Sequence, residues 1–241
     1  MYYLTGFHAI EERIKSGKTC GPLLMAKPGP RAQELVTLAH ENKIRIDRTG
    51  TYDLDKLAPD NRGIALIVDD VRVNPADTNI ETFLADLGDR ENALVVILDE
   101  ITDPHNYGAI LRSCDQFGVD LVISAKRRSA KNADVIAKTS AGAISWVPQA
   151  ETANLVRAAD ELKEAGFWIY GADAGGEPVH TKDLRGKTAI VLGSEGTGIS
   201  RLLVERCDAM VSIPTTGKID SLNVSVAAGI LLYEVKQQML G

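Results

Sequence analysis

The sequence predicts a two-domain α/β protein, in which a small domain precedes a larger one built on a parallel sheet. Residues 1–73 alternate short apolar runs with helical patterns, and the run NPADTN then interrupts this alternation. From Ala93 onward, near-continuous apolar segments alternate with helical ones, which is typical of parallel strands covered on both faces. We therefore expect a domain at 1–73, a linker at 74–90 and a second domain at 91–241.

The small domain is predicted element by element from its periodicity. The segment GFHAIEERIKSG is an amphipathic helix, because Phe7, Ile10 and Ile14 recur at spacings of three and four before Gly17 ends the pattern. RAQELVTLAHEN predicts a second helix. PLLMA, KIRID and GIALIVDDV predict strands.

The larger domain contains five strand-like runs separated by helical segments. These runs are ALVVILDEI, VDLVISA, GFWIYGA, TAIVLGS and AMVSIP, and a long helix, SLNVSVAAGILLYEVKQQML, comes last. Ligands of such sheets bind at the carboxyl ends of the strands. Three of these ends lead into unusual turns, so we expect the functional site there.

Composition excludes several classes of protein. The net charge of −6 argues against coating nucleic acid through bulk electrostatics, although AKRRSAK at 125–131 is a compact basic cluster. Cys20, Cys114 and Cys207 are far apart and read as reduced thiols. We see no secretion signal, no membrane span and no grouping of histidines and cysteines for zinc. We therefore expect a cytoplasmic protein without metal and without a membrane partner.

The first unusual turn lies in DEITDPHNYGAILRSCDQFG, residues 99–118. Pro104 sets the turn, and Asn106 stands at a position favoured for a helix N-cap. Ile110 belongs to the apolar stripe of the helix that follows, whereas Arg112 lies about 200° away from it. A capped helix with a solvated arginine explains this pattern as well as a functional site does.

The second turn lies in AIVLGSEGTGIS, residues 189–200. A phosphate-binding loop places a lysine after its last glycine, but here Ile199 follows Gly198. The carboxylate of Glu195 would repel phosphate, and it suits hydroxyls, amines or a cation. A tight turn with Glu195 in solvent is the alternative.

The third turn lies in VSIPTTGKIDSLNVSVAAG, residues 211–229. A strand ends at Pro214, and a long helix begins at Ser221 or Asn223, where backbone N–H groups are unpaired. Helix capping explains one of these two polar residues and not both.

Together the three turns resemble a known family. The order N-x-G-A-I-L-R-S, L-G-S-E-G-x-G and I-P-x-x-G-x-x-x-S-L-N-V-S-V-A closely resembles the signature motifs of the SpoU family of RNA 2′-O-ribose methyltransferases, over roughly residues 93–238. The resemblance implies a SPOUT methyltransferase domain with a C-terminal trefoil knot. It also implies a homodimer with the active site beside the interface.

The resemblance implies S-adenosylmethionine as the cofactor, with no metal. Its reacting end is a sulfonium cation, which explains a glycine loop with a carboxylate and no lysine. By matching positions, Gly193, Ile213 and Leu222 would hold the adenine and ribose, with Leu192 and Pro214 close by.

The catalytic residues are also assigned by resemblance. They are Arg112, Asn106, Glu195, Ser221 and Asn223, and Glu195 is expected to engage both Asn106 and Arg112. Most of the catalysis would come from holding the hydroxyl oxygen, methyl carbon and sulfur in line.

A ribose hydroxyl must lose its proton, and two residues are candidates for assisting this step. His105 is the obvious one from chemistry, because histidine titrates near neutrality. The resemblance points instead to Arg112. It would either lose a proton transiently or orient the hydroxyl and the adjoining phosphate while another group takes the proton.

The small domain, opening YYLTGFHAIEERIKSGK, resembles the ribosomal-protein-like substrate-binding domain of the subfamily that methylates a guanosine of 23S ribosomal RNA. Where those relatives carry His-Gln-Gly, this chain has Asn61-Arg62-Gly63. The basic residues expected to bind RNA are Arg127, Arg128 and Lys131. Two alternatives are a transfer-RNA ribose methyltransferase and a ribosomal-RNA-binding protein without catalysis.

Overall fold

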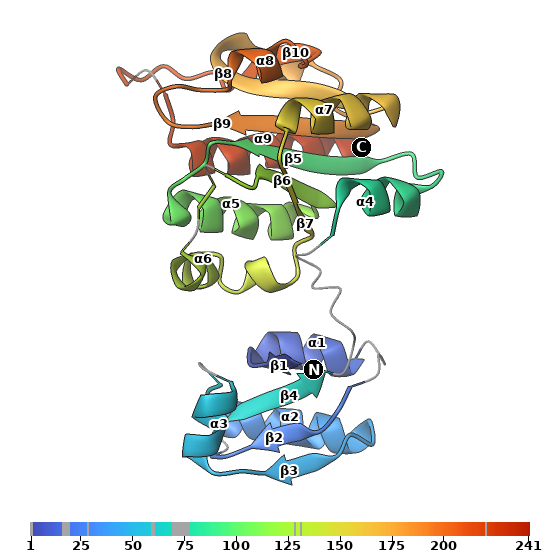
Figure 1. The fold of residues 1–241 in the computed structure, drawn as a ribbon, viewed down its shortest axis with the longest axis vertical. Coiled ribbons are helices and arrows are strands. Elements are labelled where there is room, and N and C mark those ends of the chain that lie inside the picture. The colour runs from blue at the N-terminus through green and yellow to red at the C-terminus, as the bar shows by residue number, and fades with distance from the viewer. Residues whose placement is uncertain are drawn as a thin grey trace. The chain divides into compact units, whose positions relative to one another are not determined.

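The structure is a computed structural model, which describes residues 2–15, 20–27, 29–58, 61–68, 78–127, 129–130, 132–219 and 221–241. By its internal contacts the chain divides into two units, Met1–Val73 and Asn74–Gly241 (Figure 1). Each unit is described by itself below.

The first unit is a four-stranded sheet with helices on both faces. The strand order is β1-β4-β2-β3, in which β2 and β3 are parallel and the other pairs antiparallel. One face packs against α1 and α2, and α3 contributes Leu54 to the opposite face. The elements are β1 (Tyr2–Leu4), α1 (Phe7–Lys15), β2 (Leu23–Met25), α2 (Pro30–Glu41), β3 (Ile46–Arg48), α3 (Thr51–Leu57) and β4 (Ile64–Val68).

The second unit contains a six-stranded sheet in the order β10-β8-β9-β5-β6-β7, and every neighbouring pair is parallel. The predicted parallel sheet is thus confirmed. Its strands are β5 (Ala93–Asp99), β6 (Leu121–Ala125), β7 (Gln149–Thr152), β8 (Trp168–Pro178), β9 (Lys187–Gly193) and β10 (Ala209–Ser212). The strand β7 was not predicted, because its sequence QAET has no apolar run and pairing with β6 alone defines it.

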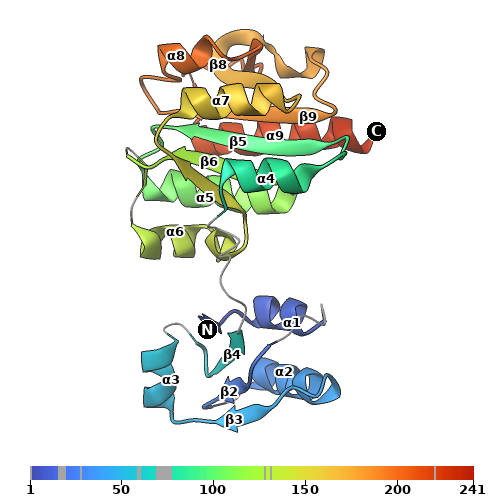
Figure 2. The ribbon, with the colours of Figure 1, turned by 45° about the vertical axis from the view of Figure 1, so that its right-hand side comes forward.

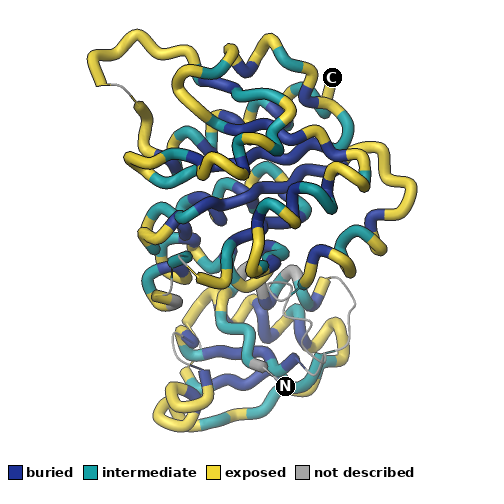
Figure 3. The backbone as a smooth tube through the Cα atoms, turned by 45° about the horizontal axis from the view of Figure 1, so that its top comes forward, coloured by how far each residue is buried: buried dark blue, intermediate teal, exposed yellow. Residues whose placement is uncertain are grey.

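Helices cover both faces of this sheet. Figures 1 and 2 show α7 in front of the strands and α9 behind them, and buried residues follow the strands in Figure 3. One apolar cluster joins the sheet to α5 and α9, and a second joins it to α4 and α7. The remaining elements are α4 (Ile80–Leu87), α5 (Pro104–Phe117), α6 (Ala133–Thr139), η1 (Ala143–Ser145), α7 (Leu155–Glu164), η2 (Val179–Thr181), α8 (Arg201–Val204) and α9 (Val224–Leu240). No helix in the described part of the chain is long and apolar enough to cross a membrane.

The helix α4 occupies residues 80–87 of the linker expected at 74–90, whose residues 74–77 lie outside the described ones. The side chain of Asn79 caps this helix by accepting a hydrogen bond from the Thr82 N–H. Ile80 and Leu87 are buried in the core of the second unit. The acidic composition of the segment suggested a solvated connection, but its apolar residues recur at helical spacing and pack against the sheet.

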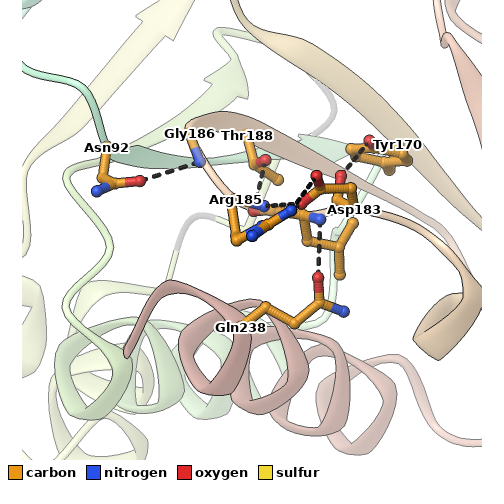
Figure 4. A network of polar contacts seen from close by, with 8 residues as sticks. Asn92, Tyr170, Asp183, Arg185, Gly186, Thr188 and Gln238 are labelled. Carbon is orange, nitrogen blue, oxygen red and sulfur yellow. Dashed lines mark hydrogen bonds and ion pairs between the residues drawn. The ribbon is translucent and has the colours of Figure 1, made fainter. Parts of the chain in front are cut away.

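A polar network fixes α9 to the amino end of β9 (Figure 4). The Gln238 Oε1 accepts a hydrogen bond of 2.9 Å from the Leu184 N–H. The Leu184 carbonyl accepts one from Thr188, and the Asp183 carbonyl accepts one from Tyr170. This segment therefore ties the last helix to two strands.

Replacing Gln238 tests this network. Gln238→Leu leaves the partly buried Leu184 N–H without its acceptor, which lowers the free energy of unfolding by about 1–3 kcal/mol. Urea denaturation measures the loss. The matched control Gln237→Leu, at an exposed position of the same helix, changes stability by less than about 0.5 kcal/mol. Equal losses for the two variants would contradict the assignment.

Candidate active site

Three loops of the second unit meet at one edge of its sheet. Because all six strands are parallel, the ends of β5, β9 and β10 lie on the same side. The register places Asp99, the last residue of β5, opposite Gly193, the last residue of β9. The loop after β6 joins this edge through a 3.1 Å hydrogen bond from the Ala130 N–H to the Ile101 carbonyl.

The first loop places Asn106 in the first turn of α5. The helix cap is Asp103, whose carboxylate accepts hydrogen bonds from the N–H groups of His105 and Asn106. The expectation that Asn106 is the cap is therefore wrong. Because Asp103 satisfies the helix end, the Asn106 side chain is available to donate to the Glu195 Oε1 at 3.2 Å.

The third loop ends at Asn223, which has two roles. Its Oδ1 caps α9 by accepting from the N–H groups of Ser225 at 3.0 Å and Val226 at 3.4 Å. Its Nδ2 donates to the Asn106 Oδ1 at 2.9 Å and to the Glu195 Oε1 at 2.6 Å. The structure thus joins three predicted site residues from three different loops.

The second loop presents Glu195 on a tight turn. The Gly198 N–H donates to the Ser194 carbonyl at 2.9 Å, and both Gly196 and Gly198 have positive φ angles. The Glu195 carboxylate is exposed at the tip of this turn. The same Oε1 that binds both asparagines also lies 3.4 Å from the Val224 N–H, at the start of α9.

Asp99 holds the far end of this loop, a role that the sequence motifs do not reveal. Its carboxylate is 5% exposed and accepts a 2.7 Å hydrogen bond from the Ser200 N–H. A buried acid with one backbone partner fixes the position at which the loop returns to the sheet. The signal in the sequence was an acid that ends an otherwise apolar strand.

The close packing of the loop explains why residue 193 is a glycine. A Cβ atom at this position would overlap the backbone of Gly198 and Ile199. A larger residue would therefore displace the turn that carries Glu195. A variant of Gly193 cannot test cofactor contact alone, because it also rearranges the loop.

The other expected cofactor residues differ in exposure. Leu192 is 1% exposed and its side chain belongs to the core, so only its main chain could meet a ligand. Ile213 is partly buried against that core, and Leu222 is 37% exposed. Pro214 is exposed.

The loop after β10 has free main-chain groups. No backbone N–H or carbonyl of residues 214–219 forms a hydrogen bond with the backbone of another described residue. These groups are available to a ligand at the edge where Glu195 lies.

Arg112 does not engage Glu195 in this structure, contrary to expectation. It lies six residues beyond Asn106, about 9 Å further along α5 and on a different side of the helix. Its side chain is exposed, and no described residue accepts a hydrogen bond from it. Ser221 is also exposed, as is His105. Arg112 is therefore an exposed cation that lies outside the hydrogen-bond network around Glu195.

The basic cluster after β6 is described in part. Arg127 is exposed at the carboxyl edge of the sheet. Arg128 and Lys131 lie outside the described residues. No group of three or more histidine, cysteine or acidic side chains suited to a metal occurs in the described ranges.

None of the three cysteines forms a disulfide. Burial raises the pKa of the Cys114 thiol. Burial, together with the charge of Asp208, raises the pKa of Cys207 to about 11. These two side chains stay as thiols at neutral pH, so neither is a ready nucleophile.

Comparison with known families decides the class. The model of the SpoU rRNA Methylase family matches residues 93–233, and a model described as RNA 2′-O ribose methyltransferase substrate binding matches residues 3–73. The chain belongs to the SpoU methylase family. It is an RNA methyltransferase, and the predicted substrate-binding domain is confirmed.

Relatives cover nearly the whole chain. A tRNA/rRNA methyltransferase of Borreliella burgdorferi is 41% identical over 219 residues, which span 88% of this chain and 96% of that protein. A TrmH family tRNA/rRNA methyltransferase of Bacillus subtilis is 36% identical over 237 residues, spanning 97% and 94%.

Solved structures show the same fold. The SpoU methyltransferase AviRb from Streptomyces viridochromogenes has 26% identity and a TM-score of 0.72, covering 99% of this chain and 90% of AviRb. A further structure of AviRb, with a TM-score of 0.70, is a complex with the cofactor AdoMet, which is S-adenosylmethionine. The A. aeolicus TrmH/SpoU tRNA modifying enzyme has 31% identity and a TM-score of 0.55, covering 66% of this chain and 81% of that enzyme.

A carboxylate in place of the Asn223 amide tests the network that surrounds Glu195. Asn223→Asp keeps the helix cap but sets two carboxylates side by side, which raises the pKa of one of them in the folded protein. A raised folded pKa means that stability is lost as pH rises, so the free energy of unfolding relative to wild type falls between about pH 4 and pH 7.

The matched control is Asn223→Ser, which can also cap α9 and adds no charge. Its difference from wild type stays constant over the same pH range. Urea denaturation at several pH values measures both variants. A flat pH profile for Asn223→Asp would show that residue 223 and Glu195 are not in contact.

Proposed function

We propose that this protein transfers a methyl group from S-adenosylmethionine to the ribose 2′-hydroxyl of a guanosine in 23S ribosomal RNA. The observation that carries the proposal is the network in which Glu195 accepts hydrogen bonds from Asn106 and Asn223. Three motifs far apart in the sequence meet there, and Arg112 is exposed on α5, the helix that also carries Asn106. An RNA-binding protein without catalysis has no need of this arrangement.

The residues at the sheet edge fit the cofactor. The adenosyl group has no phosphate, and the glycine turn at 193–198 contains no lysine and one exposed carboxylate. The unpaired main-chain groups of 214–219 would bind the adenine and ribose, with Ile213 and Leu222 against them. When bound, S-adenosylmethionine supplies a methyl group on a cationic sulfur. A carboxylate beside that site favours a cation.

Arg112 would orient the nucleophile. An exposed guanidinium offers a planar fork of donors that matches a phosphate group. It would hold the phosphate next to the target ribose, and thereby place the 2′-hydroxyl for attack. Asn106 and Asn223 keep Glu195 in place, and Ser221, at the entry to α9, would contact the substrate or cofactor. Under this assignment the proton leaves to the phosphate or to water.

Two observations bear on the RNA target. A substrate-binding domain precedes the catalytic one, and the 23S guanosine is proposed from its resemblance to that subfamily. The relatives are named tRNA/rRNA methyltransferases, so transfer RNA is the second candidate. The two candidates share one chemistry and differ only in which RNA accepts the methyl group.

We also propose a cytoplasmic homodimer with a knotted C-terminal segment. The helix α9 carries an exposed apolar stripe in which Val226 is 50%, Ile230 39% and Tyr233 52% exposed. Tyr233 extends this stripe toward α5 through an edge-on ring contact with Phe117. An apolar stripe on a helix next to the active-site edge is suited to burial against a second copy.

Methyl transfer with labelled cofactor tests the function. The wild-type protein labels the ribose of unmodified 23S ribosomal RNA, and Arg112→Ala lowers the turnover number by at least about 100-fold with near-normal cofactor affinity in calorimetry. The control His105→Ala, one residue from the network, retains activity.

Nuclease digestion of the product separates ribose from base methylation, and bulk transfer RNA is assayed in parallel. Label on a base, or on no RNA, would contradict the proposed reaction. Label on transfer RNA alone would show that transfer RNA, and not 23S ribosomal RNA, is the substrate. A crippled His105→Ala with an active Arg112→Ala would reverse the assignment of the two residues.

A further inference from the structure

One end of the small sheet carries three basic residues, of which one ends a strand and two lie just beyond the ends of the neighbouring strands. Met25, the last residue of β2, lies opposite both Arg48 on β3 and Ile64 on β4. Lys27 follows Met25 by two residues, and Arg62 precedes Ile64 by two. Since neighbouring strands are about 4.8 Å apart, these positions span roughly 10 Å. We call Lys27, Arg48 and Arg62 the cationic edge.

The cationic edge has no acidic partner. All three residues are exposed, and none forms an ion pair or side-chain hydrogen bond with a described residue. Other basic residues of the same unit are held in ion pairs: Lys15 with Glu11, Arg31 with Glu34, and Arg45 with Asp47. Lys43 and Lys56 also form no ion pair with a described residue, but no second unpaired basic residue lies beside either of them at a strand end, whereas three unpaired basic residues converge at this end of the sheet.

The turn that presents Arg62 is fixed by a buried side chain. Asn61 is 4% exposed, donates to the Asp55 carboxylate at 2.6 Å and accepts from the Gly63 N–H at 2.7 Å. Arg62 has a φ of 49°, a conformation that is unfavourable for an arginine. A Cβ at Gly63 would overlap the Lys27 carbonyl, so the turn packs directly on the end of β2.

The strained Arg62 makes one long contact with another described residue of the unit. Its guanidinium lies 6.0 Å from the Phe7 ring centroid, at the outer limit of a cation–π contact, and none of its five donors bonds to a described residue. A rigid turn that holds an unpaired guanidinium beside a free lysine and a second free arginine matches the requirements of a phosphate chain.

We infer that the cationic edge binds the phosphodiester backbone of the RNA substrate. This inference rests on the proposed function, because it names the surface of the small domain through which that RNA is held. The net charge of the chain is −6, so attraction to RNA must come from such a local cluster rather than from the protein as a whole. Backbone contacts of this kind position RNA and carry little sequence information.

The test compares two charge-matched triple variants of the full chain. The first variant replaces Lys27, Arg48 and Arg62 by Gln. The second, which is the control, replaces the ion-paired Lys15, Arg31 and Arg45 by Gln. Affinity for unmodified 23S ribosomal RNA is measured at several salt concentrations, together with methyl transfer and cofactor binding.

The cationic-edge variant raises the dissociation constant for RNA at least about tenfold at low salt. It lowers the slope of log affinity against log salt by about 2–3, whereas the control variant stays close to wild type. The loss in methyl transfer falls on KM for RNA and not on the turnover number or on cofactor affinity. Arg62→Asn, a residue that tolerates the left-handed region, reproduces part of the effect with the fold unperturbed.

The outcomes separate this inference from the proposed function. If wild type methylates RNA and the two triple variants weaken RNA binding equally, the cationic edge is not the binding surface and the function stands. If wild type neither binds nor methylates any RNA tested, the proposed function fails and the inference fails with it.

Discussion

The arrangement of the active site depends on one oxygen atom, the Oε1 of Glu195. It accepts hydrogen bonds from the side-chain amides of Asn106 and Asn223, at 3.2 and 2.6 Å, and lies 3.4 Å from the Val224 N–H. Glu195 follows β9, Asn106 follows β5, and Asn223 and Val224 follow β10. A carboxylate with several donors is a stronger link than neutral pairs, because its full charge strengthens each hydrogen bond. This oxygen makes three separate motifs into one site.

The parallel sheet makes that link possible, and buried contacts keep it in register. Asp99 and Gly193 end neighbouring strands opposite each other, so the loops leave the sheet side by side. The Asp99 carboxylate also accepts a hydrogen bond from the Ser200 N–H. Asp99 therefore holds the segment that carries Glu195 both where it leaves β9 and where it returns to the sheet. At the opposite edge, Gln238 ties the last turn of α9 to the start of β9. The helix that Asn223 caps is therefore held at both ends, while the free main chain at 214–219 stays open for a ligand.

The sequence predicted the parts of the fold that follow from periodicity and missed those that follow from pairing. The five apolar strands were recognisable, whereas the polar β7 exists through its ladder with β6. The motif order predicted that Asn106, Glu195 and Asn223 belong together, and the structure brings them into contact. It could not show that Asp103 rather than Asn106 caps α5, because both residue types favour that position. The sequence also could not show that Arg112 makes no hydrogen bond with Glu195, because these two residues lie on different loops and helices and their separation depends on the fold.

A double-mutant cycle between Asn106 and Asn223, read in the methyl-transfer rate, tests most directly whether the loops act as one unit. Asn106→Ala, Asn223→Ser and the double variant are compared with wild type at saturating cofactor. If Glu195 is held jointly, the second substitution costs much less once the first is made, and the coupling free energy is about 1 kcal/mol or more. Additive effects, with a coupling energy near zero, would show that the two amides act independently and would contradict the account.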